Sequence, residues 1–596
     1  MIEGSFTSMQ SLLWPEPGIS TERELYMRLS GPVAHSLTGR SLTFSAGGQA
    51  SFDTSANLFN LGKWRRHCGE TDLGLRLEGE GRFELVVMQA LTEHSCECLF
   101  SEAVAVAVDR PFRLDLTPHL LPGHRGVVYF SLQALGDGRL TGAGWETTAT
   151  PRRLPQLALS ITTFKREAAV RASVARFEEF MTRTALAPYL HLFVVDNGQS
   201  AGIQASTHVT PIANENLGGS GGFARGLLAA EDRGASHCLF MDDDASIHME
   251  GLERTWAFLA YAEDPRVAIA GGMTMANRRW AIWESGAIFD RYCRPQWIGT
   301  DLRRFWEVLK MELDSTGVKP HNFYGGWWYF AFPITQAKYR PFPFFVRGDD
   351  ISFSIANDFE IVTLPGVVCF QDADFSDKET LQTLYLDLRS HLAHHLALPS
   401  MDIGRKGVLL IIAQFFARSM MQEHYDTLRA LRLAVEDVLQ GPEFFAANAD
   451  MAERRGRIGQ MRKTEAYVPL QGPPPASRRR FDPRKNLFLR GVMKYSLNGH
   501  LLPFFGIWGN AVTLKSGQRG QLNEVWGAAR ITYVNSDETQ SFTVRHSKWI
   551  AAREGLAMLG AMARLAWKYP ALRESWRKGY AELTTGNFWQ SKFGSR

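Results

Sequence analysis

At 596 residues the chain exceeds what one hydrophobic core normally supports, so several domains are expected. Hydrophobic residues make up 45% and charged residues 21%, as in a globular protein, and a formal net charge of +4 gives no reason to expect a nucleic-acid partner. The six cysteines lack zinc-ligand spacing and the first residues lack a signal peptide's basic start and apolar core, so we expect reduced thiols in the cytoplasm.

Residues 1–150 predict a β-domain. Apolar and polar residues alternate over 73–77 and again over 83–87, on either side of a Gly-Glu-Gly turn, and 104–108 and 127–132 are typical of further strands. Short strands with Gly and Pro turns indicate a sandwich or a small barrel. Such a domain either binds carbohydrate or packs on its neighbour, and packing is the commoner role.

Residues 151–400 predict a second domain with an open parallel sheet. After a Pro-rich linker, strands are expected at 157–161, 192–195 and 238–242, each followed by polar or acidic residues and joined to the next by a helix. Ligands bind such sheets at the carboxyl ends of the strands.

The third of these strands ends in Asp242, Asp243 and Asp244. Alternate residues of an extended segment share a face, so Asp242 and Asp244 are expected to point together, where they could hold one divalent cation and leave room for substrate phosphates. A solvated acidic turn is the alternative. The position at a strand end, after a glycine-rich loop, favours the metal site.

That loop, residues 218–222, has neither the Walker lysine nor the dinucleotide spacing of glycines. Alone it could be a flexible turn. Before a helix, it offers free backbone N–H groups to a diphosphate or a sugar.

Two later clusters follow in the same domain. Trp327 and Trp328 come after two glycines and predict an aromatic shelf with at least one ring facing a pocket, although both could belong to the core. Asp349 and Asp350 are expected to open a helix, where a carboxylate also gains from the helix N-terminus. Two acidic sites in one domain suggest that one holds a metal while the other takes a proton.

Residues 401–596 predict a mainly helical third domain. Its longest apolar run, 407–417, is too short to span a bilayer. The arginines of an exposed loop at 472–480, and a helix over 549–568 that places basic residues beside Trp and Leu, fit either an anionic membrane surface or ordinary solvent and packing.

These residues carry a resemblance. Residues 157 to about 390 resemble the family 2 glycosyltransferases with the GT-A fold, and the whole chain is similar to the bacterial polymerising galactofuranosyltransferases. The segments that match are Thr163-Phe-Lys-Arg, Val194-Val-Asp-Asn-Gly, Asn214-x-Asn-x-Gly-Gly-x-Gly-Gly, Asp242-Asp-Asp, Gly325-Gly-Trp-Trp, Arg347-Gly-Asp-Asp, the N-terminal Asn57-Leu-Phe-Asn-Leu-Gly-Lys-Trp-Arg-Arg and the tail 534–593.

The resemblance implies a role for each matching residue. It implies donor binding by Thr163, Phe164, Arg166, Asp196, Asn216, Gly218, Gly219 and Asp243. It implies acceptor binding by Glu284, Trp327 and Trp328, with Asp350 as general base and Asp349 as its acceptor-positioning partner. It also implies a divalent ion, Mn²⁺ or Mg²⁺, on Asp242 and Asp244.

One position departs from the family pattern. The family expects a metal-binding histidine after the Leu364-Pro-Gly turn, and this chain has Gln371 there. A glutamine oxygen is a hard ligand that binds Mn²⁺ less tightly than an imidazole does. Asp372 or Asp374 could substitute after a small shift, whereas His391, His394 and His395 are expected to be ordinary residues of the following helix.

The leading hypothesis is therefore an inverting, metal-dependent transferase that moves galactofuranose from UDP-galactofuranose to a growing, lipid-linked cell-surface glycan. Peripheral contact with the inner face of the membrane and a homo-oligomer are compatible with it. The same fold with another donor (rhamnosyl, glucosyl or galactopyranosyl) is the nearest alternative, and a carbohydrate-binding scaffold with a decayed centre is a third.

Overall fold

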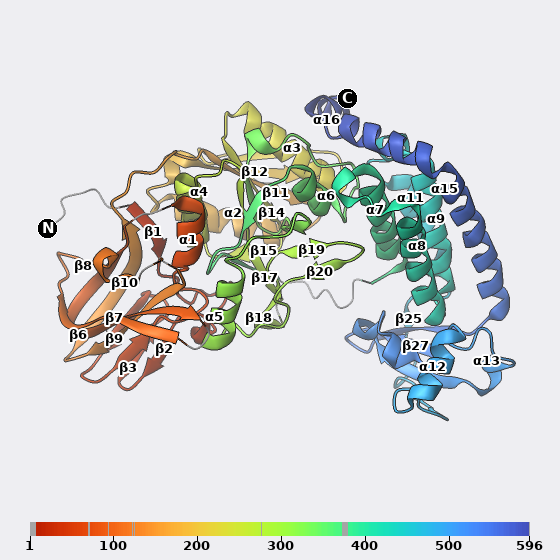
Figure 1. Cartoon of the computed structure of the whole chain (residues 1–596), viewed down its shortest axis with the longest axis horizontal. Coiled ribbons are helices and arrows are strands. Elements are labelled where there is room, and N and C mark those ends of the chain that lie inside the picture. The colour runs from red at the N-terminus through yellow and green to blue at the C-terminus, as the bar shows by residue number, and fades with distance from the viewer. Residues whose placement is uncertain are drawn as a thin grey trace. The chain divides into compact units, whose positions relative to one another are not determined.

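The computed structural model describes residues 7–69, 72–92, 95–121, 123, 125–275, 277–371 and 379–594 (Figure 1). It is a mixed α/β structure, as predicted. Its contacts form two units. Unit 1 takes the described residues up to Asn216, then Gly222–Lys338 and 353–371; unit 2 takes Leu217–Gly221, Tyr339–Ser352 and the described residues from 379 onward. The domain boundaries at 150 and 400 stay a prediction.

The N-terminal part of unit 1 is a β-structure whose described strands join in one ten-stranded sheet, with the order β2-β5-β9-β6-β10-β4-β3 and with β1, β7 and β8 at its sides. Its strands are β1 (Thr7–Ser11), β2 (Arg28–Ser30), β3 (Val33–Ser36), β4 (Ser41–Phe44), β5 (Gln49–Ser51), β6 (Gly74–Thr92), β7 (Ser95–Val106), β8 (Phe112–Asp115), β9 (Val127–Ala134) and β10 (Gly138–Thr147).

The turn predicted at Gly79-Glu80-Gly81 is wrong, because β6 runs through it as one continuous strand. Gly79 and Gly81 have φ values of 143° and 125°, which only glycine adopts readily. A Cβ at Gly79 would lie 2.0 Å from the carbonyl oxygen of Arg139 on β10. The glycines therefore bend the strand against its neighbour, and its two halves serve different partners: β8 and β10 first, then β7 and β9.

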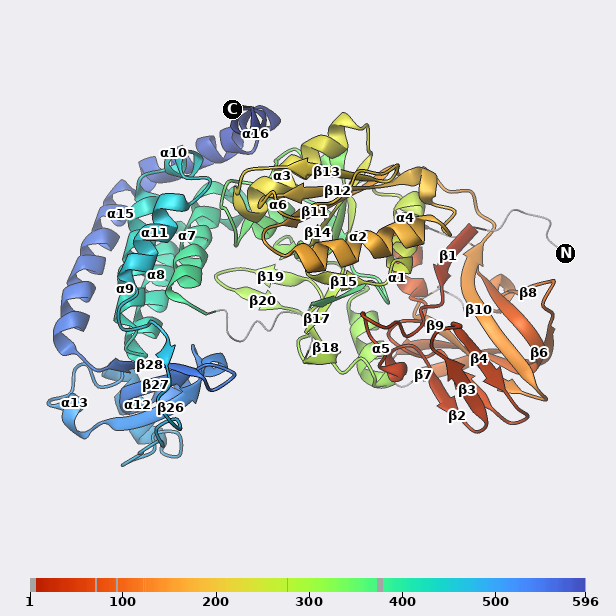
Figure 2. The same ribbon diagram turned by 180° about the vertical axis from the view of Figure 1, so that it is seen from behind.

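A seven-stranded sheet with the order β13-β12-β11-β14-β22-β16-β23 forms the centre of unit 1. Strands β11, β12 and β14 are parallel, as predicted, and β13 adds a further parallel strand that the sequence analysis missed. Strand β22 is antiparallel to both of its neighbours. The strands are β11 (Leu157–Thr163), β12 (Leu190–Asp196), β13 (Val209–Ala213), β14 (His237–Asp242), β16 (Val267–Ala270), β22 (Phe330–Pro333) and β23 (Glu360–Val362). Helix α2 (Glu167–Met181) packs on β11 (Figure 2).

Glycines bring helix α3 (Gly218–Asp232) close to this sheet. A Cβ at Gly222 would lie 2.1 Å from Thr162, and one at Gly226 would lie 1.8 Å from the Ser160 hydroxyl, both on β11. No larger residue fits at either position without displacing the helix. Part of the glycine-rich stretch therefore serves helix–sheet packing.

Shorter elements surround the sheet in unit 1. They are α1 (Leu61–Cys68), α4 (Glu250–Tyr261), α5 (Phe305–Asp314), β15 (Ala245–Ile247), β17 (Gly272–Met275), β18 (Arg278–Glu284), β19 (Ala287–Phe289), β20 (Cys293–Pro295), β21 (Phe323–Tyr324) and β24 (Val368–Gln371). The order β15-β24-β17-β18 forms a second small sheet.

Buried polar contacts fasten the N-terminal β-structure to the rest of unit 1. Asn60 caps α1 and donates from Nδ2 to the Glu312 carboxylate on α5 at 2.9 Å, and Lys63 Nζ lies 2.6 Å from the same carboxylate. Arg254 on α4, 2% exposed, donates to the carbonyl oxygens of Ala56 and Ser11. These contacts favour the packing role of the N-terminal part over an independent binding domain.

Unit 2 is mainly helical, as predicted for 401–596, but it also contains a sheet that the sequence analysis missed. Its helices are α7 (Leu381–Ala397), α8 (Gly404–Met421), α9 (Tyr425–Leu439), α10 (Pro442–Ala447), α11 (Ala452–Met461), α12 (Leu487–Tyr495), α13 (Phe505–Trp508), α14 (Leu522–Val525), α15 (Lys548–Leu583) and α16 (Gly586–Phe593). Helix α6 (Asp349–Ala356) begins in it. The sheet has the order β25-β28-β27-β26, from β25 (Val468–Pro469), β26 (Asn510–Lys515), β27 (Ala528–Val534) and β28 (Gln540–Arg545).

The helices α7, α8, α9 and α15 pack together with buried leucines, and α15 runs along the outside of this group (Figures 1 and 2). Across the part of the chain that the structure describes, we find no helix of the length and apolar character needed to cross a membrane.

Candidate active site

The strand register brings three predicted residues to one edge of the central sheet. Thr163, the last residue of β11, lies opposite Asp196, the last residue of β12. On the other side, Thr162 lies opposite Asp242, the last residue of β14. The carboxyl ends of three neighbouring parallel strands therefore meet at the place where open α/β sheets bind ligands.

The acidic triplet at this edge is engaged by residues of the β11 turn. Thr163 Oγ1 donates to Asp243 Oδ2 at 2.8 Å, and the Arg166 guanidinium pairs with both Asp243 and Asp244. Burial raises the pKa of Asp243, against the lowering effects of Thr163 and Arg166. Arg166 is about half exposed, so its cationic head can leave the carboxylates when another cation or a phosphate arrives.

Gln371 completes the cluster from a distant part of the chain. It pairs with Ala245 across β24 and β15, which places its amide Nε2 at 3.4 Å from Asp242 Oδ2 and 3.3 Å from Asp244 Oδ1. Gln371 Oε1 is buried and, among the described residues, accepts no hydrogen bond. A rotation of the amide would turn this unused oxygen toward the carboxylates.

These residues fit a divalent metal ion. Two carboxylates and an amide oxygen form an all-oxygen donor set, which suits Mg²⁺ or Mn²⁺. Asp372 and Asp374, the predicted substitutes for the missing histidine, lie outside the described residues. His391, His394 and His395 are buried in α7, as expected of ordinary helix residues, and burial lowers the pKa of His391 to about 4.

Asp196 orders the loop after β12. Its two carboxylate oxygens accept from the backbone N–H groups of Gly198 at 2.9 Å and Ala201 at 2.7 Å. On the neighbouring turn, Phe164 is 40% exposed and Lys165 adopts a left-handed φ of 54°. The two turns thus present an ordered carboxylate and an open aromatic ring at the same sheet edge.

In unit 2, the start of the glycine-rich stretch contacts the second acidic pair. Gly218 has a φ of 69°, and a Cβ there would lie 2.0 Å from the carbonyl oxygen of Phe345. Ser220 Oγ donates to Asp349 Oδ2 at 2.9 Å, and a Cβ on Gly219 would lie 3.5 Å from the same oxygen. Sequence reasoning missed Ser220, although its place inside the glycine-rich loop was a signal. Asn216, the remaining donor residue of this stretch, is half-buried in unit 1.

Asp349 and Asp350 open helix α6, as predicted. Asp349 is buried and Asp350 is half-buried. Burial raises the pKa of Asp349 to about 6, and burial together with the neighbouring Asp349 charge raises the pKa of Asp350 to about 7. Such a pair shares its protons, so one carboxylate is ready to accept a proton near neutral pH.

The two tryptophans of the predicted aromatic shelf differ in burial. Trp327 is only 5% exposed, with its ring among Phe223, Phe240 and Phe353, so it belongs to the core. Trp328 is half-buried, and its Nε1 donates to the carbonyl oxygen of Gly271 at 2.9 Å.

Trp327 is buried because three phenylalanine rings from separate elements pack against it, which two adjacent tryptophans in a sequence cannot indicate. Glu284, the other predicted acceptor residue, is buried at the end of β18.

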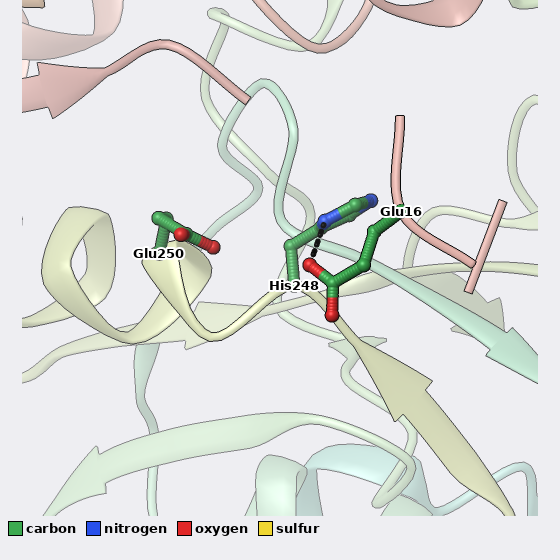
Figure 3. A group of neighbouring side chains, drawn as sticks. All are labelled: Glu16, His248 and Glu250. Atoms are coloured by element: carbon green, nitrogen blue, oxygen red, sulfur yellow. Dashed lines mark ion pairs between the residues drawn. The ribbon is translucent and has the colours of Figure 1, made fainter. Parts of the chain in front are cut away.

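A further cluster of possible metal ligands lies elsewhere in unit 1. Ligand atoms of Glu16, His248 and Glu250 lie within 4.8 Å of one another, and Figure 3 shows the Glu16 carboxylate directed at the His248 ring. Arg40 pairs with Glu16 at 2.9 Å and with Glu250 at 2.8 Å, and Arg183 also pairs with Glu250 at 3.0 Å. Because guanidinium groups already neutralise both carboxylates, we interpret this cluster as an ion-pair network. Glu16 is more than two hundred residues from His248 and Glu250 in the sequence, so no sequence pattern indicated this cluster.

Two curated relatives match the chain over most of its length. The galactofuranosyltransferase GlfT2 of Mycolicibacterium smegmatis is 24% identical over 98% of this chain and 95% of its own length. GlfT2 of Mycobacterium tuberculosis is 23% identical over 74% of each chain. No family model matches.

Solved structures give weaker matches. GalNAc-T7, solved with UDP, GalNAc and Mn²⁺, is 9% identical with a TM-score of 0.28 over 43% of this chain and 50% of its own. Mannosyl-3-phosphoglycerate synthase from Rubrobacter xylanophilus is 12% identical with a TM-score of 0.25 over 40% and 74%.

With its acidic strand end and its relatives matched over most of its length, the chain is a glycosyltransferase. Within that class, the resemblance to the galactofuranosyltransferases that the sequence predicted is confirmed by both GlfT2 relatives.

Proposed function

We propose that the chain is an inverting, metal-dependent galactofuranosyltransferase that uses UDP-galactofuranose and extends a lipid-linked cell-surface glycan. The observation that carries the proposal is the meeting of Thr163, Asp196 and Asp242 at the carboxyl ends of three parallel strands, with Gln371 against the acidic triplet. The similarity to both GlfT2 relatives over most of the chain supports the choice of donor.

In this proposal the turns after β11 and β12 bind the nucleotide. Phe164 offers a ring face to the uracil base, and Asp196 accepts from its N–H or from the ribose hydroxyls. Arg166 moves from the triplet to the diphosphate, and Asp243, held by Thr163, faces the ribose. The glycine-rich stretch, with Asn216, Gly218 and Gly219, lets backbone N–H groups approach the donor.

Asp242, Asp244 and Gln371 would hold Mn²⁺ or Mg²⁺ by their oxygens. When bound, the ion supplies positive charge that offsets the charge developing on the leaving diphosphate. The GT-A version of the α/β fold belongs to the same proposal.

Asp350 takes the proton of the attacking acceptor hydroxyl. At the same time, the hydroxyl oxygen bonds to the anomeric carbon and the bond between that carbon and the diphosphate breaks. One such displacement inverts the anomeric centre and needs no covalent enzyme intermediate. Asp349 hydrogen-bonds and positions the acceptor. Glu284 and Trp328 contact the acceptor sugar, and the buried Trp327 supports them from the core.

The acceptor is proposed to be lipid-linked, which would bring the enzyme into peripheral contact with the inner face of the membrane. The enzyme itself is proposed to be cytoplasmic. The lipid-linked acceptor and the membrane contact are both inferred from the similarity to the relatives. A homo-oligomer remains compatible with them.

A panel of nucleotide sugars tests the proposal. The enzyme is incubated with each UDP- or dTDP-sugar, a galactan acceptor and Mn²⁺, and released nucleotide and extended product are measured. We expect turnover with UDP-galactofuranose. Preference for a rhamnosyl, glucosyl or galactopyranosyl donor would refute the assigned donor, and no nucleotide release with any donor would favour a decayed carbohydrate-binding scaffold.

A further inference from the structure

A cavity of about 220 Å³ lies at the amino ends of β11 and β12, at the edge of the central sheet opposite the candidate active site. The polar side chains that line it are Gln156, Tyr189, His191 and Arg233. No aspartate or glutamate lines it among the residues that the structure describes. Because β11 and β12 each have seven residues, the cavity is about 20 Å from Thr163 and Asp196 at their other ends. It is therefore separate from the proposed donor site.

Arg233 brings a positive charge to this cavity. It directly follows helix α3, whose glycines pack on β11 (Figure 2). The backbone N–H groups of Arg233, Gly234 and Ala235 already bond to carbonyl oxygens in the last turn of α3, so the helix end does not need the guanidinium. Arg233 is exposed, and its side chain forms no ion pair or hydrogen bond with any residue that the structure describes. The charge is thus available to a ligand.

His191 is buried with one ring nitrogen unused. It is 5% exposed and lies on the face of β12 that also carries Phe193, which packs with Phe223 and Leu227 of α3. Its Nε2 lies 2.9 Å from Thr210 Oγ1, while Nδ1 is buried and has no hydrogen-bond partner in the described part of the chain. Buried polar atoms normally have a partner, so an unused one beside a cavity indicates a ligand. With the Thr210 hydroxyl donating to Nε2, Nδ1 carries the proton and can donate to an oxygen atom in the cavity.

The groups around His191 favour an anion as this ligand. The charged groups that act on it are Arg233, at the end of α3, and His208, just before β13. Its partner in register on β11 is Ala158, which does not titrate. Burial, together with Arg233 and His208, lowers the pKa of His191 to about 4. A bound cation would add to the positive charge here, whereas a bound anion would offset it.

We infer that this cavity binds a phosphate group, as inorganic phosphate or as a small phosphate ester, through the Arg233 guanidinium, the Gln156 amide and the His191 imidazole. An arginine can donate two parallel hydrogen bonds to phosphate oxygens, and an amide and an imidazole can each add one. The inference goes beyond the proposed transfer reaction and does not depend on it, because none of these residues belongs to the proposed donor, acceptor or metal site.

Calorimetric titration of the whole chain with inorganic phosphate, and separately with ribose 5-phosphate, tests the inference. Arg233→Gln removes the charge and keeps an amide donor, and it should weaken binding about tenfold or more. Gln156→Glu places a carboxylate in the cavity and should weaken binding at least as much, since like charges repel. Tighter binding of ribose 5-phosphate would assign the site to an ester, and tighter binding of inorganic phosphate would assign it to the free anion.

Matched controls separate the cavity from other cationic surface. Arg82→Gln and Gln133→Glu make the same changes at exposed positions of β6 and β9, and both variants should bind phosphate like the wild type. Arg166→Gln changes the candidate active site instead. Circular dichroism should show that all variants keep their fold. Wild-type affinity in both cavity variants, loss of binding in Arg166→Gln alone, or no phosphate binding by the wild type would overturn the inference.

Sulfate gives an independent readout because, unlike phosphate, it does not titrate near neutral pH. A bound anion should raise the pKa of His191, so sulfate binding should take up protons and tighten as the pH falls. Calorimetry in two buffers with different enthalpies of ionisation measures this uptake. His191→Gln keeps a group that can bond to Thr210 and should reduce the uptake. No proton uptake by the wild type, or the same uptake in His191→Gln, would overturn the role of His191.

Discussion

Replacing Asp349 with asparagine should move the acidic limb of the pH–rate profile to lower pH. Burial and the charge of Asp349 raise the pKa of Asp350 to about 7. A general base acts only when deprotonated, so kcat/KM should reach its plateau above this pKa and fall as the pH drops through it. At one pH unit below the limb, kcat/KM should be about a tenth of its plateau.

Asparagine keeps the shape of the Asp349 side chain and removes only its charge. Burial is the larger cause of the raised Asp350 pKa, and it remains in this variant. The acidic limb should therefore move to lower pH but stay above the ordinary pKa of an aspartate. Ser220→Ala should act in the opposite direction on the pair, since the Ser220 hydroxyl lowers the pKa of Asp349.

The assay is initial nucleotide release between about pH 5 and about pH 9, at limiting acceptor, which reports the free-enzyme ionisation. Asp109→Asn, which changes an exposed carboxylate in the turn after β7, is the control and should leave the limb in place. Asp350→Asn should abolish transfer while UDP binding, measured by calorimetry, persists. An unmoved or raised limb in the Asp349 variant, or normal turnover without Asp350, would refute the reasoning.

Three further predictions follow from single contacts. Gln371→His should tighten Mn²⁺ binding about tenfold, and Gln371→Ala should weaken it about tenfold. Calorimetric titration measures both affinities without turnover. Equal affinities in the wild type and both variants would exclude Gln371 as a ligand. Lys63→Met should cost about 3–5 kcal/mol by leaving the Glu312 carboxylate buried and unpaired, and thermal unfolding should show that adding Glu312→Leu recovers much of the loss. Gly226→Ala should lower the melting temperature, consistent with a cost of about 1–3 kcal/mol, because its Cβ would enter the sheet, whereas Gly251→Ala, with open space around it, should not.

The central strands β11, β12 and β14 could be predicted within about two residues because buried parallel strands are continuous apolar runs with polar residues at their ends. Asp242 at such an end was therefore visible in the sequence. Gln371 could be placed only by resemblance, since its contact with the triplet depends on the pairing of β15 with β24, more than a hundred residues apart. No local pattern encodes that register.

Elsewhere local patterns misled. The glycines at 79 and 81 have the composition of a turn, but long-range pairing on both sides keeps β6 continuous. The resemblance placed Trp327 in the acceptor site, and three phenylalanines from separate elements enclose it instead. In β26, by contrast, buried and less buried residues alternate, and Val512-Thr-Leu-Lys shows the apolar–polar pattern that is typical of a strand.

The buried pair of Lys63 and Glu312 has a consequence for synthesis of the chain. The lysine leaves the ribosome 249 residues before its carboxylate partner. At about 5–20 residues per second this is a delay of roughly 12–50 s. Arg254 is synthesised between Lys63 and Glu312. Its hydrogen bonds require the carbonyl oxygens of Ser11 and Ala56 to be already in position. For much of translation Lys63 therefore has no carboxylate partner. A ribosome stalled before Glu312 should hold a partly folded intermediate that proteases and chaperones can recognise.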